Sequence, residues 1–351
     1  MRNVALVSFA QTPFKRRENE RTEVQMVRSV TQEAVEKSGI PKGEIGFTCS
    51  GSSDYIAGNA FAFVGAVDAL GAWPPIMESH VEMDGAWALY EAWIKIQMGY
   101  AESALVFSFG RASMGTLPET LTLQLDPYTL APLGLDTISA AALQARAWLD
   151  ATDHNERDMA EVAVRSRRDA KDNPFALLKG DFEIEKLLAE PYLASPLRKH
   201  DCPPITDGAN AAVLCSEELA RKVCDKPVWI RGIDHRIEPH HLGFRDLTQS
   251  VSTRLAGQKA GVDPARLDIA ELHAPFTHQE LILREALGLG EGVRINPSGG
   301  PLAANPMMAA GLSRIGEAAN QIWAGDAGRA LAHATQGHCL QQNMVCVLEG
   351  E

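Results

Sequence analysis

The chain has 351 residues, 45% of them apolar, which is enough to bury a large core as two domains or as one duplicated domain. Its 45 acidic residues outnumber its 33 lysines and arginines, and the net charge of −12 argues against a nucleic-acid partner, because phosphates call for a basic face. No apolar run reaches the roughly 18 residues of a membrane span, so no membrane association is expected.

The predicted elements alternate between strands and helices. An opening strand is followed by a helix over 22–39 with a capping box at its start, and another helix follows the sequence ESHVEMDGAW at 78–87. Residues 141–171 are typical of two helices, and 203–223 of a turn, a buried strand and a helix. A strand within 225–238 then opens a second half. This order predicts an α/β fold with a largely buried sheet.

Two patterns recur in the same order and at nearly the same separation, which suggests an internal duplication. The helix start at Gly85 matches that at Gly311. We therefore predict two halves, 1–222 and 223–351, with an inserted helical loop region at about 115–200 in the first. The other matched positions are Gly39, Ile45 and Phe47 in the first half and Gly261, Leu267 and Ile269 in the second.

The cysteines are scattered and form no CxxC pairs, so neither a disulfide framework nor a zinc site is expected. The N-terminal segment alternates like a strand and lacks a cleavage site. Together these features predict a cytoplasmic protein with reduced thiols. The six are Cys49, Cys202, Cys215, Cys224, Cys339 and Cys346.

Four motifs carry a family resemblance: CPPITDGANAAVLCSEE (202–218), ELHAPFTHQELILREALGL (271–289), INPSGGPLAANPMMAAG (295–311) and ALAHATQGHCLQQNMVCVLE (330–349). In this order and spacing they resemble the thiolase superfamily, and within it the sterol-carrier or lipid-transfer-protein branch. The resemblance covers essentially the whole chain and implies a five-layered αβαβα fold of two similar halves. It also implies a homo- or heterodimer of thiolase chains through the central sheets.

The resemblance locates the residues that should carry catalysis. Aligned without gaps, the family's nucleophilic cysteine falls on Glu82, and a small gap would move it to Asp84 or Gly85. None of the three can form an acyl-thioester enzyme. The family's Gly-His-Pro histidine is replaced by Asn305, whereas the histidine that opens its His-Asp-Cys-Phe motif is kept as His273.

Each candidate also has a simpler structural interpretation. A buried carboxylate at Glu82 or Asp84 could act as a base with a raised pKa, or it could be part of a salt-bridged scaffold. Cys339, beside His338, could act as acid, base or relocated nucleophile, or could only fill space in the core. Asn305 could donate to an oxyanion or could be a turn residue before a proline.

A second group is predicted to hold the substrate or its coenzyme A. Gly299 and Gly300, after Ser298, would let the backbone approach a ligand, although two glycines also simply make turns. Arg168, with Arg165 and Arg167 nearby, could meet a coenzyme A phosphate, although a solvated helix face explains such charges equally well. His278 is either a binding residue or a polar residue at a helix start.

Retro-aldol cleavage of a 3-hydroxyacyl-CoA is the chemistry that survives without the cysteine. A base removes the 3-hydroxyl proton, the C2–C3 bond breaks, and an oxyanion hole holds the resulting thioester enolate. SHVEMDGAWALYEA and CSGSSDYIAGNAFAF look closest to actinobacterial members of the branch that are associated with sterol side-chain degradation. No covalent cofactor and no metal are expected, and coenzyme A enters as part of the substrate.

The resemblance leaves the base and the partner open. Aldolases of this kind are thought to use tyrosines of the second half, but all five tyrosines lie in the first. The base is therefore His273, His338 or a carboxylate at 82–84, or it belongs to a partner, either a small zinc-ribbon/OB-fold protein or a second thiolase-like chain. An acyl-CoA acyltransferase and a non-catalytic, lipid-binding subunit are the alternatives. The tyrosines are Tyr55, Tyr90, Tyr100, Tyr128 and Tyr192.

Overall fold

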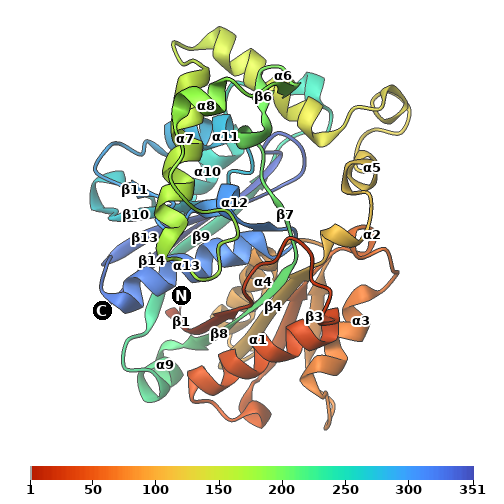
Figure 1. The fold of residues 1–351 in the computed structure, drawn as a ribbon. Coiled ribbons are helices and arrows are strands. Elements are labelled where there is room, and N and C mark those ends of the chain that lie inside the picture. Colours follow the sequence, from red (N-terminus) through yellow and green to blue (C-terminus); the bar gives the residue numbers. More distant parts are fainter. Residues whose placement is uncertain (1) are drawn as a thin grey trace.

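The computed structural model describes residues 2–351 as a mixed α/β fold built on a ten-stranded sheet in the order β11-β10-β13-β14-β9-β1-β8-β4-β2-β3 (Figure 1). The strands of the first half are β1 (Val4–Gln11), β2 (Phe47–Gly51), β3 (Glu78–Val81), β4 (Ser103–Gly110) and β8 (Gly208–Ser216). Those of the second half are β9 (Val228–Ile237), β10 (Ile269–Leu272), β11 (Arg294–Ile295), β13 (Arg329–Gln336) and β14 (Gln342–Glu349). Two short pairs, β5 (Tyr192–Ala194) with β6 (Leu197–Arg198) and β7 (Ile205–Thr206) with β12 (Asn305–Pro306), lie outside this sheet.

Thirteen α-helices connect these strands in the described part of the chain. They are α1 (Glu23–Ser38), α2 (Asp54–Ala57), α3 (Ala62–Val67), α4 (Gly85–Gln97), α5 (Leu117–Thr122), α6 (Thr137–Ala151), α7 (Glu156–Asp169), α8 (Ile184–Leu188), α9 (Glu217–Val223), α10 (Val251–Ala260), α11 (Thr277–Leu287), α12 (Gly300–Ala303) and α13 (Ala310–Ala324). No helix within residues 2–351 is long and apolar enough to cross a membrane.

The two halves repeat the same topology. Starting from the central strand of each half, β1-β8-β4-β2-β3 corresponds to β9-β14-β13-β10-β11, with two antiparallel pairings followed by two parallel ones in both. Gly39 and Gly261, which the repeat equated, both end a helix in the left-handed conformation, with φ of 70° and 75°. The predicted α/β class with duplicated halves is confirmed.

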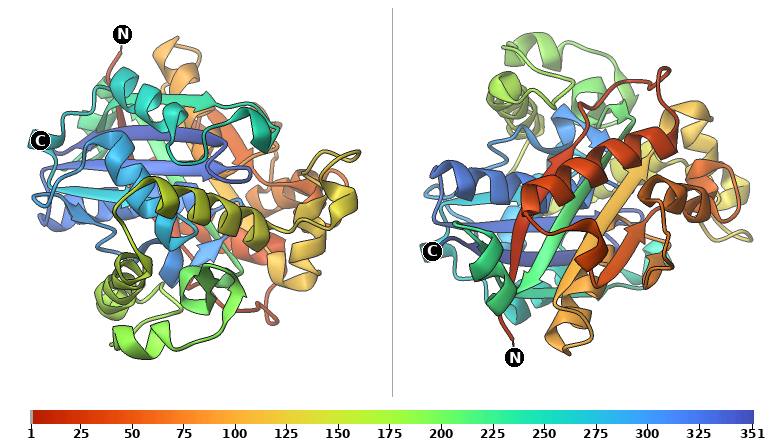
Figure 2. Two further views of the ribbon diagram at one scale, coloured as in Figure 1. Left: turned by 90° about the horizontal axis from the view of Figure 1, so that it is seen from above. Right: turned by 90° about the horizontal axis from the view of Figure 1, so that it is seen from below.

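The apolar residues explain the layering. In the central layer, α4 and α13 pack between the inner faces of both halves of the sheet in one continuous core. On the outer face of the first half, α1 covers β1, β8 and β4, as the view from below shows (Figure 2). On the outer face of the second half, α10 and α11 pack on β10, β13 and β14. The helix, sheet, helix, sheet, helix order is the five-layered fold that the resemblance implied.

The inserted region belongs to the first half in sequence but packs on the second half in space. α6 and α7 share a core with α11, and Arg165 of α7 forms an ion pair with the buried Glu280 of α11, with 2.5 Å between Nη2 and Oε1. Figure 1 shows this region, in yellow and green, beside the blue helices. The insertion therefore covers the end of the second half where β10 and β13 finish. The predicted boundary at 222/223 falls at the end of α9 and stays a prediction.

One carboxyl group joins the two central helices. Asp84 is the N-cap of α4, where its Oδ1 accepts from the Ala86 N–H at 2.9 Å. The same side chain accepts from the first turn of α13, with Oδ2 2.8 Å from the Gly311 nitrogen and Oδ1 3.0 Å from the Leu312 nitrogen. The first backbone N–H groups of a helix have no partner within the helix. Here a single residue accepts hydrogen bonds from such groups at the starts of both helices.

This shared cap leaves no space at Gly311. A Cβ atom there would lie 2.5 Å from Asp84 Oδ1 and 2.7 Å from the Ala334 Cβ, so we expect Gly311→Ala to lower the free energy of unfolding by about 1–3 kcal/mol through overpacking. The matched control is Gly65→Ala in α3, where a Cβ would meet nothing within 4 Å and should change stability by no more than about 1 kcal/mol. Urea unfolding measures both. Equal stabilities for the two variants would contradict the shared cap.

Candidate active site

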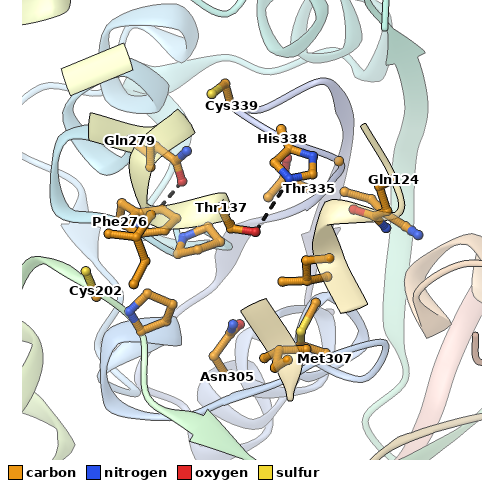
Figure 3. Close-up of a pocket in the computed structure, with 18 of the residues that line it drawn as sticks. Gln124, Thr137, Cys202, Phe276, Gln279, Asn305, Met307, Thr335, His338 and Cys339 are labelled. Carbon is orange, nitrogen blue, oxygen red and sulfur yellow. Dashed lines mark hydrogen bonds between the residues drawn. The ribbon is translucent and has the colours of Figure 1, made fainter. Parts of the chain in front are cut away.

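A mostly apolar cavity of about 200 Å³ lies where the ends of β10, β12 and the β13–β14 hairpin meet α5, α6 and residues 202–205 (Figure 3). Five predicted residues line it: Asp84, His273, Asn305, His338 and Cys339. The apolar lining comes from Leu117, Pro118, Leu121, Ile138, Ala141, Pro203, Pro204, Ile205, Pro275, Phe276, Met307, Met308 and Leu340. No lysine or arginine is among the described residues that line it.

The hydrogen bonds of His273 fix which of its nitrogens carries the proton. The backbone N–H of Thr335 donates to Nδ1 at 3.3 Å, so Nδ1 must be the unprotonated nitrogen. Nε2 then carries the hydrogen and donates it to Oδ1 of Asn305 at 3.1 Å. Burial lowers the pKa of His273 to about 3, so the imidazole is neutral at physiological pH.

This pairing orients the Asn305 amide as well. Because its oxygen faces His273, its NH₂ group is the free end, and Nδ2 donates to no other group within residues 2–351. His273 follows β10 and Asn305 begins β12, so two different strands bring their side chains to the same wall. The wall therefore offers the NH₂ group of Asn305 as a donor of the type that holds an oxyanion.

His338 lies across the cavity from this pair, on the β13–β14 hairpin. Its Nε2 is 3.5 Å from the Thr137 hydroxyl, a long contact that leaves the imidazole available (Figure 3). Burial, with His240 and Arg245 nearby, lowers the pKa of His338 to about 4. The ring is therefore unprotonated at neutral pH and can accept a proton.

Cys339 is a poor candidate for a thiolate. Its thiol donates to the Ala140 carbonyl at 3.4 Å and packs against Ala140 and Leu242 at the rim of the cavity. Burial raises the pKa of this thiol to about 12, although Arg245 acts in the opposite direction. At neutral pH the group is a buried thiol, which favours the packing interpretation over a nucleophile.

The two carboxylates of the turn before α4 differ in position. Glu82 does not line the cavity, which corrects the expectation that placed it there: its side chain is 50% exposed, and Oε1 caps α2 by accepting from the Asp54 N–H at 2.7 Å. Asp84 does line the cavity, and burial raises its pKa against the effect of its backbone donors. Both Asp84 oxygens are, however, occupied by the helix starts.

The residues predicted to bind coenzyme A also lie outside the cavity. Ser298 donates to the buried Glu271, with Oγ and Oε2 2.7 Å apart. Gly299 and Gly300 have φ of 95° and 62°, and Cβ atoms there would meet Ala170 and Asn296, so tight packing explains both glycines. Arg168 is exposed on α7 beside Asp169.

His278 is a core residue and not a lining residue, which corrects its predicted binding role. It is fully buried in α11, where Nε2 lies 3.2 Å from Oε1 of Gln144 in α6. It joins the insertion to the second half. Burial lowers the pKa of His278 to about 3.

Several polar residues of the cavity, among them Thr137, Gln124 and Tyr55, carry no sequence signal of a site role. Thr137 starts α6, Gln124 follows α5, and Tyr55 lies in α2, all in the first half. Gln124 Nε2 donates to the Tyr55 hydroxyl, and burial raises the pKa of Tyr55 to about 12. Tyr55 was noted only as a first-half tyrosine, and no sequence signal indicated that α2 reaches the cavity.

Metal binding has no candidate in this region. Within residues 2–351, no group of three or more His, Cys, Asp or Glu side chains is arranged to hold a metal ion.

The buried His278 should make the fold sensitive to acid. Because its folded pKa lies well below 6.5, the unfolded chain takes up more protons than the folded one as the pH falls from about 6.5 toward 3. The stability advantage of wild type over His278→Gln should therefore shrink by about 2 kcal/mol between pH 7 and pH 5. Chemical unfolding at both pH values measures it. A difference between wild type and His278→Gln that stays constant from pH 7 to pH 5 would contradict the argument.

Comparison with known proteins is consistent with this arrangement. The chain is 30% identical over 297 residues to the benzoylsuccinyl-CoA thiolase subunit BbsB of Thauera aromatica, covering 74% of this chain and 75% of that protein. It is 26% identical to human sterol carrier protein 2 over 372 residues, 94% of this chain and 67% of that protein. A scan against models of known protein families found no match.

Solved structures share the fold at lower identity. An Ltp2-ChsH2(DUF35) aldolase superposes with a TM-score of 0.84 at 21% identity, over 99% of this chain and 97% of that chain. The acetyl-CoA acetyltransferase of Bacillus anthracis superposes with a TM-score of 0.81 at 17% identity, over 100% and 99%. From its relatives, its motifs and its fold, the chain belongs to the thiolase superfamily, in the sterol-carrier thiolase-like branch.

Proposed function

We propose that this protein cleaves the C2–C3 bond of a 3-hydroxyacyl-CoA thioester by a retro-aldol reaction. The observation that carries the proposal is the His273–Asn305 pair, which leaves the Asn305 NH₂ group as a free donor in a cavity where no residue of the turn before α4 can form an acyl-thioester enzyme. Claisen chemistry needs both an acyl-enzyme and an enolate, whereas retro-aldol cleavage needs only the enolate. The thiolase relatives are likewise named for reactions of acyl-CoA thioesters.

The reaction assigns one role to each group. His338 accepts the proton of the 3-hydroxyl, the oxygen's electron pair forms the new carbonyl, and the C2–C3 bond breaks. The electrons of that bond become a thioester enolate, whose oxygen is held by the NH₂ group of Asn305, which the hydrogen bond from His273 keeps turned toward the cavity. The imidazolium of His338 returns its proton to C2. The products are an aldehyde or ketone and a shortened acyl-CoA, so atoms and charge balance without a cofactor.

His338 is the base because the other candidates are occupied. His273 uses Nδ1 to accept from Thr335 and Nε2 to donate to Asn305. Asp84 uses both oxygens as helix caps, and Glu82 lies outside the cavity. The Tyr55 hydroxyl, which keeps its proton because of its raised pKa, can donate a hydrogen bond to the substrate.

The cavity lining favours an uncharged, apolar acyl group. Apolar side chains dominate it, and the carboxyl groups of Asp84 and Asp136 would repel an acyl carboxylate that no lysine or arginine of the lining could neutralise. We propose a sterol side chain carried as its CoA thioester. The similarity to human sterol carrier protein 2 supports this proposal.

A second subunit belongs to the proposal. The thiolase relative is named as a subunit, and the aldolase neighbour is a two-component protein. We propose a complex with a small zinc-ribbon/OB-fold protein or a second thiolase-like chain, assembled in the cytoplasm, in which this chain carries the catalytic cavity.

The test is an assay with a 3-hydroxyacyl-CoA thioester of a steroid side chain, run with and without the co-expressed partner. Mass spectrometry should detect an aldehyde or ketone together with the shortened acyl-CoA. No such products with the partner present would refute the aldolase. Products that persist when this chain carries His338→Gln would show that the partner holds the active site.

A pair of neighbouring variants separates retro-aldol from acyl-transfer chemistry. His338→Gln should lower kcat by roughly 10²–10⁴-fold because it removes the base. Cys339→Ser, one residue away, should leave kcat within a few-fold of wild type, because the thiol donates a hydrogen bond to the Ala140 carbonyl and has no role in the proposed reaction. Steady-state kinetics measures both. The acyltransferase would be favoured by two results together. Cys339→Ser would lose turnover, and iodoacetamide would inactivate the wild-type protein unless coenzyme A were present to protect it.

A further inference from the structure

The hairpin that carries His338 has an unusual backbone. Gly337, Cys339 and Leu340 all have positive φ, at 78°, 54° and 58°. Glycine adopts this region freely, but the backbone of the other two residues is strained there. Such a conformation persists only where the surroundings fix it, so contacts from outside the hairpin must hold His338 in place.

Arg245 supplies the charged part of these contacts. It follows the short 3₁₀ helix Leu242–Phe244, between β9 and α10. Nη2 donates to the His338 carbonyl at 2.8 Å, and Nη1 donates to the Cys339 carbonyl at 3.1 Å. One guanidinium therefore holds two successive carbonyl oxygens, which matches the fixed fork of its N–H groups.

The Arg245 side chain has no other hydrogen-bond partner in the described chain. It forms no ion pair with a carboxylate in the described chain, and it does not line the cavity. A neutral contact holds the hairpin two residues further on, where the Glu238 N–H donates to the Gln341 carbonyl at 2.8 Å, but at the Cys339 carbonyl the neutral donor Gln144 is longer, at 3.4 Å. The side-chain hydrogen bonds of Arg245 in the described chain thus go to the hairpin.

We infer that Arg245 is a positioning residue for the catalytic base: its guanidinium fixes the 338–339 backbone so that the His338 imidazole faces the cavity. The inference rests on the proposed function only in calling His338 the catalytic base. The two hydrogen bonds from Arg245 to the His338 and Cys339 carbonyls, which we call the clamp, are a feature of the structure itself. Arg245 does not touch the substrate cavity, so its loss should affect turnover far more than substrate binding.

The charge of Arg245 has a second effect on His338. The titratable groups around this imidazole are His240, Arg245 and Glu238 on the segment after β9, and Asp136 at the start of α6. Together with burial, which is the largest cause, His240 and Arg245 lower the pKa of His338. Removal of the Arg245 charge should therefore raise that pKa and move the acid limb of the pH–kcat profile to higher pH.

Three variants of the complete protein with its partner test the inference. Arg245→Ala should lower kcat by about 10²-fold with KM nearly unchanged, because a base misplaced by about 1 Å costs that much. Arg245→Lys keeps the charge but cannot span both carbonyls, so it should lower kcat while leaving the pH profile in place. Guanidinium added below unfolding concentrations should restore part of the kcat of Arg245→Ala. The exposed Arg254→Ala on α10 is the matched control and should behave like wild type.

Two outcomes overturn the inference. The first is a kcat for Arg245→Ala within two-fold of wild type. The second is a loss of kcat that guanidinium does not restore, with an unshifted pH profile, because a merely destabilised fold would behave in that way.

A readout without turnover keeps this test separate from the proposed function. The NMR resonance of the His338 ring, assigned by its absence in His338→Gln, should titrate at higher pH in Arg245→Ala than in wild type. If the protein has no aldolase activity, a shifted titration still supports the clamp, and an unshifted titration refutes it.

Discussion

The shared cap at Asp84 is the constraint on which the rest of the site depends. Two helices from opposite halves of the duplicated fold begin at the same point, and three backbone N–H groups converge there on one carboxyl group. Those N–H groups cannot be left unsatisfied in a buried layer. Because both oxygens of Asp84 are occupied by them, this candidate for the family's nucleophile position serves the scaffold. In the proposed reaction the chemistry then comes from the second half.

The second half supplies that chemistry through strand ends. His273 follows β10, Asn305 begins β12, and His338 lies on the β13–β14 hairpin, so three separate chain segments meet over the central layer. The first half adds the apolar wall through α5 and α6, together with Thr137 and Tyr55. The second half of the duplicated fold thus supplies the histidines and the Asn305 amide, while the first half mainly shapes the cavity and adds hydroxyl groups.

Sequence patterns were sufficient for the fold and for part of the site. Strand–helix alternation and the paired helix ends at Gly39 and Gly261 predicted the duplicated α/β topology, because such patterns report local backbone geometry. Motifs singled out His273 and Asn305 separately as site candidates, and the structure shows that their side chains are hydrogen-bonded to each other. The direction of a side chain is a different matter. Glu82 turns outward to cap α2, and Gly299 and Gly300 serve packing, because tertiary contacts decide those outcomes and a linear pattern does not record them.

The histidines show most clearly why the site needs the structure. His273, His278 and His338 all have lowered pKa values because they are buried, so their neutral state alone does not separate them. Their hydrogen bonds do. A backbone N–H turns His273 into a fixed donor, and Gln144 ties His278 into the core. His338 makes only a 3.5 Å contact with Thr137, and the clamp on its hairpin acts through backbone carbonyls and leaves the ring free. A general base requires a neutral imidazole that has no strong hydrogen-bond partner and whose backbone is held in place.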